Sequence, residues 1–253
     1  MASTPPLLRV AGLAKHFGGV VALADISFEI AAGSLHTILG PNGCGKTTLF
    51  NLIDGSLKPT AGRIDFDGRR TDGLAPHRIS RLGIARKFQV PGVFSELTVA
   101  QNLEIALARV GGNYSVRSLL KVRPDRDRRD ELAALAGLAE KLSFPVSDVA
   151  HGERQRLEIA MLLADDVRLL LLDEPTAGMS VMETESVARL ARRLSEERGM
   201  AVLVVEHDLG FVRALDAPVF VANQGRIIAR GDYEEIRKDP EVIRSYLGTA
   251  ADA

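Results

Sequence analysis

Residues 40–48 read Gly40-Pro41-Asn42-Gly43-Cys44-Gly45-Lys46-Thr47-Thr48 and meet every position of the phosphate-binding loop pattern G-x-x-x-x-G-K-[ST]. Glycines in such a loop let consecutive backbone N–H groups converge on phosphate oxygens. Lys46 is expected to reach the β- and γ-phosphates, and the Thr47 hydroxyl is expected to hold Mg²⁺. The stretch therefore predicts a site for a nucleoside triphosphate and its magnesium ion.

The flanks of the loop suit this interpretation. Residues 35–39 are a short apolar run typical of a buried strand, and residues 46–57 have a helical pattern whose start adds partial positive charge. The alternative, an ordinary tight turn between strand and helix, is less favoured. Within the loop, Lys46 and the helix start favour the thiolate form of Cys44. The other interpretation of Cys44 is a small loop residue without chemistry of its own.

Composition indicates a soluble globular protein. The 253 residues can bury a substantial core, and 46% hydrophobic and 26% charged residues are ordinary values. A net charge of −1 argues against a surface built mainly for nucleic acid, and a single cysteine excludes an internal disulfide. We expect no signal peptide and no membrane-spanning run, so that other chains would supply any membrane-spanning part.

Two carboxylates follow an apolar run at residues 169–172. The run predicts a buried strand, and ligand sites lie at the carboxyl ends of such strands. Mg²⁺ on the nucleotide would compensate Asp173, whereas Glu174 is placed to polarise a water aimed at the γ-phosphate. In the alternative interpretation, both acids cap the turn at Pro175.

A histidine repeats this placement after the apolar strand predicted at residues 201–205. His207 is then expected to hydrogen-bond the γ-phosphate or the attacking water, the alternative being a structural histidine. Gln89 is expected where a strand gives way to a loop before Pro91. Phe17, beside two glycines, is interpreted either as a ring that stacks on a nucleobase or as core filler.

The remaining pattern separates β-rich from helical segments. Strands are predicted at 7–10, 22–30 and 64–68, the last ending in a turn, and helical periodicity takes over between residues 97 and 142 as a helical insertion. Val93 and Phe94 precede it, either as local packing or as a surface for a partner. Residues 149–160 then open a helix with Gly152 at its start and Glu153 in its first turn.

Taken in order, these segments resemble the nucleotide-binding subunit of an ABC transporter, from about Leu7 to Leu247. Six elements carry the resemblance: the phosphate loop, Gln89, residues 149–153, the pair Asp173 and Glu174, residues 177–180, and His207. The resemblance implies an α/β fold, with a P-loop NTPase core of ABC type, an antiparallel β subdomain and an inserted helical subdomain. It implies one ABC ATPase domain over 1–253, with the core and β subdomain at 1–95 and 156–253 and the insertion, carrying the signature, at 96–155.

The resemblance also implies an ATPase cycle in which two subunits, identical or different, close head to tail around two ATP molecules. Glu174, His207 and Gln89 would be catalytic, and Thr47, Gln89 and Asp173 would hold Mg²⁺. Phe17 and residues 40–48 would bind ATP, and the partner's site would receive the signature residues Ala150, His151, Gly152 and Glu153. Closing and opening would drive two transmembrane permease subunits, with an extracytoplasmic solute-binding protein as a further partner. The chain would then be peripheral to the cytoplasmic face of the inner membrane.

Finer similarity points to importers. Residues 151–153, 157–160, 177–179 and 239–248 are similar to ATPases of bacterial importers for branched-chain amino acids and, especially, urea or short amides. Lipopolysaccharide-export ATPases share part of the ending, and a soluble ABC-type ATPase or a binding module without turnover are further alternatives. Two departures stand out: Ala150 lacks the hydroxyl that in the family donates to the γ-phosphate, and Ser180 stands where many relatives carry an acid.

Overall fold

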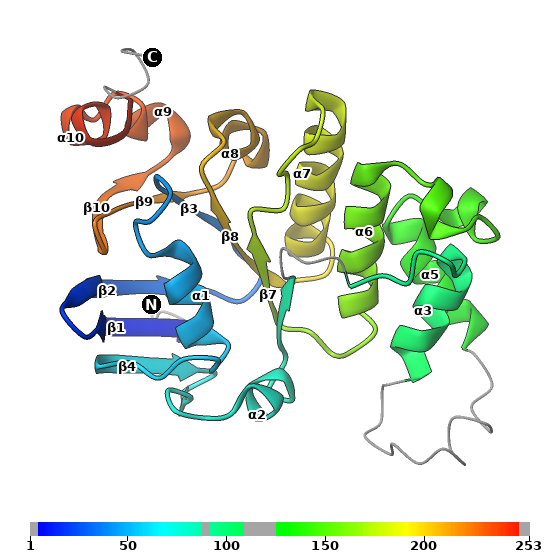
Figure 1. Ribbon diagram of the computed structural model, residues 1–253, viewed down its shortest axis with the longest axis horizontal. Helices are drawn as coiled ribbons and strands as arrows, with labels where there is room; N and C mark the ends of the chain where they lie inside the picture. The colour runs from blue at the N-terminus through cyan, green and yellow to red at the C-terminus, as the bar shows by residue number, and fades with distance from the viewer. Residues whose placement is uncertain (1–4, 88–91, 109–124, 248–253) are drawn as a thin grey trace. The chain divides into compact units, whose positions relative to one another are not determined.

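The computed structural model describes residues 5–87, 92–108 and 125–247 (Figure 1). The chain forms two compact units. The first comprises Met1–Arg86, Arg168–Glu174 and Ala191–Ala253, and the second comprises Lys87–Val167 and Pro175–Leu190. The predicted boundary after residue 155 falls inside a continuous helix, α6 (His151–Leu162). The predicted division into core and insertion stays a prediction.

The first unit contains a four-stranded antiparallel sheet in the order β2-β1-β4-β5. Its strands are β1 (Leu8–Phe17), β2 (Val20–Ile30), β4 (Ala61–Phe66) and β5 (Arg69–Arg70). Alternation of buried and exposed residues, as at the start of β1, is what a sheet with one solvated face requires. The three predicted early strands are present, and β1 continues further than expected, to Phe17.

The second sheet of this unit has six strands in the order β10-β9-β3-β8-β7-β6. They are β3 (Leu35–Leu39), β6 (Ile84–Lys87), β7 (Leu169–Asp173), β8 (Ala201–Glu206), β9 (Val219–Asn223) and β10 (Arg226–Gly231). Strands β7, β8, β3 and β9 run parallel, and every residue of β7 and β8 is buried. Continuous apolar runs form such strands because both faces of the sheet are covered.

The two sheets share a core with α1 (Lys46–Ile53), to which Phe28, Phe50, Phe66 and Leu203 contribute buried side chains. Each such side chain contributes roughly 1.5–3 kcal/mol when fully buried. On the other face of the six-stranded sheet, Val219 and Val221 pack with residues of α8 (Leu209–Leu215), α9 (Tyr233–Ile236) and α10 (Pro240–Val242). A short helix α2 (Pro76–Ser80) and a π-helical turn at Ile243–Leu247 complete this unit.

In the second unit, helices α3 (Val99–Ala108), α5 (Arg126–Leu135) and α6 pack against one another. Leu103, Leu132 and Leu157 are fully buried, one from each helix. Short 3₁₀ turns lie at Ala139–Lys141 and Val146–Asp148. Helix α7 (Val181–Glu196) begins in this unit and ends in the first. Among the described residues, no helix is both long and apolar enough to cross a membrane.

Candidate nucleotide site

The phosphate loop connects β3 to α1, as predicted, and neighbouring backbone packs tightly against it. Gly43 and Gly45 have φ values of 81° and 105°, a left-handed region that favours glycine. A Cβ atom on Gly40 would lie 2.4 Å from the Ala222 carbonyl oxygen, and one on Gly45 would lie 2.6 Å from the Ala22 carbonyl oxygen. The loop is therefore held between β9 of one sheet and β2 of the other, and Gly40 and Gly45 have no room for a side chain.

Lys46 is buried and its ammonium group bends back over the loop. It donates to the Gly40 carbonyl at 2.6 Å and to the Pro41 carbonyl at 3.1 Å, and it lies 3.6 Å from Glu174 Oε1. Thr47 is exposed in the first turn of α1. A positive charge and a hydroxyl thus follow a loop rich in backbone N–H groups, the arrangement that binds phosphate with a divalent cation.

The carboxyl ends of three parallel strands place the predicted acids and histidine near this loop. Leu39 of β3 is paired with Glu206 of β8, and Asp173 of β7 is paired with Val205. The Glu174 carboxylate oxygen Oε1 lies 3.4 Å from His207 Nδ1, besides its contact with Lys46. The structure therefore brings Lys46, Glu174 and His207 together at one edge of the sheet.

Glu206 is a residue whose part in this site the sequence did not reveal. It is almost fully buried, and its Oε2 accepts hydrogen bonds from the backbone N–H groups of His207 and Asp208 at 3.0 and 3.3 Å. Oε2 also lies 3.7 Å from His207 Nδ1. Two backbone bonds and a charge beside the ring hold the His207 turn in place.

Asp173 is buried and paired with a cation that was not anticipated. Its Oδ2 accepts a hydrogen bond from Arg86 at 2.6 Å, while Oδ1 is buried and has no hydrogen-bond partner. Arg86, on β6, also donates to Asp54 at 2.5 Å and to Asn51 at 2.7 Å. One oxygen of Asp173 is thus held by Arg86 and the other is left for a further partner.

Of the two interpretations of Cys44, the structure favours the small loop residue over the thiolate. Its thiol is buried in the core shared by the sheets, and this burial raises the pKa more than the positive charge of Lys46 lowers it. The carbonyl of Cys44 accepts a hydrogen bond from the Gly225 N–H at 3.1 Å. Cys44 is a small residue that fits the loop, which is the second of the two interpretations considered.

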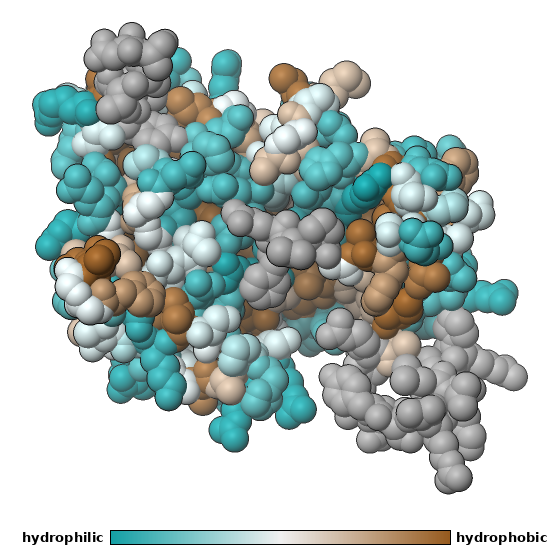
Figure 2. Space-filling model, in the orientation of Figure 1, coloured by the Kyte–Doolittle hydropathy of each residue, from teal (hydrophilic) through white to brown (hydrophobic). Residues whose placement is uncertain are grey.

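Phe17 lies at the end of β1, paired with Val20 across the hairpin, and is 46% exposed. It is not core filler. Lys15 Nζ lies 4.9 Å from the centre of its ring. Together with the exposed residues Val20 and Val21 it forms an apolar surface at the β1–β2 turn, seen in brown in Figure 2. Stacking of Phe17 on a base stays a prediction.

The structure describes Phe94 of the predicted partner surface, but not the nearby predicted catalytic residue Gln89, which lies outside the described residues. Phe94 is exposed, and its backbone is fixed by Asn102, whose side chain accepts from the Phe94 N–H at 2.8 Å and donates to its carbonyl at 3.0 Å. The local-packing alternative therefore does not describe the Phe94 ring.

The signature residues form the first turn of α6 in the second unit. Ala150 is the N-cap and offers no side-chain hydrogen bond, while its N–H donates to Glu153 at 3.0 Å. Burial opposes ionisation of Glu153, but hydrogen bonds from Lys141 and Ala150 outweigh it and lower the pKa. His151 Nε2 lies 3.3 Å from the Ala177 carbonyl, and the Gly152 N–H donates to Glu183 at 2.9 Å.

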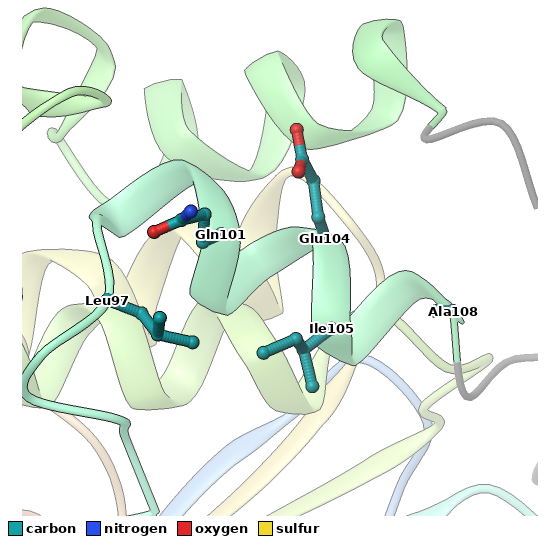
Figure 3. Close-up of a pocket in the computed structure, with 5 residues that line it drawn as sticks. All are labelled: Leu97, Gln101, Glu104, Ile105 and Ala108. Carbon is teal, nitrogen blue, oxygen red and sulfur yellow. The ribbon is translucent and has the colours of Figure 1, made fainter. Parts of the chain in front are cut away.

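A separate pocket of about 320 Å³ lies along α3 and is shown in Figure 3. Its lining is mainly apolar and is formed by Leu97, Gln101, Glu104, Ile105 and Ala108. None of the lining residues belongs to the phosphate loop or to the strand ends described above. Among the described residues, no cluster of three or more His, Cys, Asp or Glu side chains could hold a metal.

A phosphate loop between a central parallel strand and its helix, with acidic residues at neighbouring strand ends, defines the class of P-loop nucleotide-binding proteins. The family model "ABC transporter" matches residues 23–177, and the model "Branched-chain amino acid ATP-binding cassette transporter" matches residues 226–252. The chain belongs to the ABC transporter family as one of its ATP-binding cassettes, and it is an ATPase.

Relatives extend this similarity over nearly the whole chain. The high-affinity branched-chain amino acid transport ATP-binding protein LivG of Salmonella typhimurium is 38% identical, covering 97% of this chain and 99% of LivG. BraF of Pseudomonas aeruginosa, with the same description, is 36% identical with the same coverage.

Solved structures of ATP-binding cassettes are also similar to this chain. The ADP conformation of MJ1267, an ATP-binding cassette of an ABC transporter, has a TM-score of 0.84 at 28% identity and covers 97% of this chain and 100% of its own. CbiO1 of Clostridium perfringens, part of an ABC transporter complex, has a TM-score of 0.80 at 31% identity, covering 95% of this chain and 94% of its own. The predicted fold class is confirmed.

Proposed function

We propose that this chain is the ATP-hydrolysing subunit of an importer for branched-chain amino acids. The observation that carries this proposal is identity of 36–38% over nearly the full length to proteins with that description, together with the family match at residues 226–252. Urea or a short amide is the second candidate solute, from the sequence resemblance alone. The relatives' descriptions favour transport over the soluble ATPase, and they favour branched-chain amino acids over lipopolysaccharide.

ATP would lie with its phosphates on residues 40–48, where backbone N–H groups, Lys46 and the start of α1 supply positive potential. The residues present also fit a magnesium ion. Asp173 Oδ1 is buried without a hydrogen-bond partner, and Thr47 supplies a hydroxyl on the adjoining helix. Mg²⁺ usually takes one or two protein oxygens and keeps waters and substrate phosphates. Bound there, with Gln89 as a further ligand, it would neutralise charge on the phosphate oxygens.

Hydrolysis would depend on Glu174 and His207. The Glu174 carboxylate is ready to orient a water against the γ-phosphorus and to take a proton from it as the bond to ADP breaks. Lys46 lies beside the same carboxylate and would bind the negatively charged phosphate oxygens of ATP. His207, whose turn Glu206 fixes, would donate to the γ-phosphate or to the water. Gln89 would be the third catalytic residue.

Two such subunits would close around two ATP molecules, with Ala150, His151, Gly152 and Glu153 of each facing the other's phosphate loop. A dimeric structure is known for the bacterial cassette MJ0796, with a TM-score of 0.72 and 26% identity to this chain. The remaining partners we propose are two permease subunits and an extracytoplasmic solute-binding protein. The chain would lie at the cytoplasmic face of the inner membrane.

Glu174→Gln tests both parts of the proposal. The purified variant should form a dimer with ATP and return to monomer with ADP, as measured by light scattering. A variant that binds ATP and stays monomeric would contradict the closed dimer. In the source strain, the same substitution should abolish uptake of labelled leucine and leave urea uptake unchanged. Loss of urea uptake with normal leucine uptake would reverse the assignment of the solute.

A further inference from the structure

One carboxylate in the second unit serves the N-termini of two helices. Glu183 lies in the first turn of α7, where it accepts hydrogen bonds from the Ser180 N–H at 3.0 Å and the Ser180 hydroxyl at 2.8 Å. Ser180 and Glu183 therefore form the cap of their own helix, in the pattern S-x-x-E. The same carboxylate accepts from the Gly152 N–H at 2.9 Å, at the start of α6.

Gly152 and the Glu183 side chain are closely packed. A Cβ atom on Gly152 would lie 2.8 Å from both Cβ and Cγ of Glu183, so the absence of a side chain at residue 152 lets Glu183 approach. The hydrogen bonds from Gly152 and then from Ser180 lower the pKa of Glu183 to about 2. The Glu183 carboxylate, which accepts from Gly152 at the start of α6, is therefore an anion throughout the physiological pH range.

This anion occupies the donor that the proposed dimer needs. In the closed state the Gly152 N–H would face the γ-phosphate bound to the other subunit, and a phosphate oxygen and the Glu183 carboxylate cannot both take the same position on one N–H. Ala150 has no hydroxyl to serve as a second donor. Closure therefore has to exchange one anion for another at Gly152.

We propose that Glu183 is a positioning residue that holds Gly152 in the open subunit and releases it when the γ-phosphate of the facing ATP takes the same N–H. Release leaves the carboxylate bound to Ser180 alone. This inference depends on the closed dimer of the proposed function.

The test compares two charge-neutralising substitutions on the same helix, each in the Glu174→Gln background. Glu183→Gln keeps a side chain that can cap α7 but makes it a weaker, neutral acceptor for Gly152. Glu185→Gln is the matched control, because Glu185 is exposed and pairs only loosely with Arg189 at 3.7 Å. Light scattering gives the ATP concentration for half-maximal dimerisation, and a fluorescent ATP analogue at low subunit concentration gives monomer binding.

We expect Glu183→Gln to lower the ATP concentration for half-maximal dimerisation by roughly fivefold, the change for replacing a charged by a neutral acceptor. Monomer binding should not change, and Glu185→Gln should have no effect. Amide exchange at Gly152 in the open subunit should rise in Glu183→Gln only. A higher ATP requirement in Glu183→Gln, or equal values for the two variants, would overturn the inference.

The experiment also distinguishes a failure of this inference from a failure of the proposed function. If the Glu174→Gln parent forms no dimer with ATP, the proposed closed dimer fails, and the exchange of anions fails with it. If the parent dimerises and only the Glu183→Gln effect is missing, the function stands and the inference alone is wrong.

Discussion

Glu174 holds its backbone in the left-handed region, with φ of 44°, at the point where β7 ends. That conformation costs a residue with a Cβ atom roughly 1–2 kcal/mol. A strained backbone at the residue proposed to orient water is consistent with a position set by function rather than by stability.

Replacing Glu174 measures this strain directly. Both Glu174→Gly and Glu174→Ala remove the carboxylate, but only glycine adopts the observed φ without cost. Glycine normally lowers stability by roughly 0.5–1 kcal/mol relative to alanine. Here we expect Glu174→Gly to be at least as stable, by up to about 1 kcal/mol, in urea unfolding. A more stable alanine variant would show that the strain is absent.

Ala150 is an N-cap without a capping side chain, and its backbone already has the extended conformation that a cap requires, with φ of −62° and ψ of 158°. Ala150→Ser should therefore stabilise α6 by about 1 kcal/mol. It should also raise the ATPase rate of the assembled transporter, because a hydroxyl is then available to the γ-phosphate. Ala150→Gly is the control, since glycine caps nearly as well but adds no donor. An unchanged or lower ATPase rate in Ala150→Ser would contradict the expectation that the missing hydroxyl limits hydrolysis.

Arg86 links three secondary-structure elements: β6, β7 and α1. From β6 it contacts Asp173 at the end of β7, Asn51 in α1 and Asp54, which caps the end of α1. All of these charged side chains are nearly buried. Removing one partner of a buried pair leaves an uncompensated charge.

Arg86→Met should therefore lower the free energy of unfolding by about 3–5 kcal/mol. Arg81→Met is the control, because Arg81 is exposed at the end of α2 and its loss should cost less than about 0.5 kcal/mol. Urea unfolding without nucleotide measures both. Similar effects for the two variants would mean that Arg86 does not balance the buried acids.

The link between α6 and α7 predicts a dependence on pH. The Glu183 pKa falls from 4.5 to about 2 on folding, so its stabilising contribution is complete above pH 4.5 and is lost as the pH falls through about 2. The carboxyl carbon of Glu183 should therefore not titrate in NMR spectra between pH 5 and 3. Ser180→Ala removes the hydroxyl donor and should raise this pKa. Titration of Glu183 near 4.5 in the native sequence would contradict the contact.

The sequence predicted those elements whose signal is local. Buried parallel strands such as β7 and β8 are continuous apolar runs, and the phosphate loop is one contiguous pattern. The Arg86 cluster was missed because its partners lie 32 and 87 residues away, a distance that no local pattern spans. The start of α7 also carries a local signal, because Ser180 and Glu183 form a capping pattern visible in the sequence and the helix begins at Val181.

The proposed dimer would bury surface that is exposed in the single chain. Val181 and Met182, at the N-terminal end of α7, are 76% and 80% exposed and directly follow residues 177–180. Figure 2 shows hydrophobic side chains at this end of the helix. His151, which would face the other subunit in the proposed dimer, lies next to the Ala177 carbonyl of this loop, so we expect closure to cover the two side chains.

Met182→Glu should therefore raise the ATP concentration needed for dimerisation of the Glu174→Gln variant, since it places a charge where apolar surface would be buried. Ile243→Glu, at another exposed apolar residue, should not change it. Light scattering at several ATP concentrations measures both. Equal effects for the two variants would place Met182 outside the contact.

The phosphate loop takes its shape from both sheets at once. Gly40 lies against Ala222 of β9, Gly45 against Ala22 of β2, and the Cys44 carbonyl receives the N–H of Gly225. A loop enclosed in this way has no independent open state, unlike a surface lid. On heating, the ability to hold nucleotide should therefore vanish only together with the sheets themselves, and bound nucleotide should in turn protect both sheets from melting.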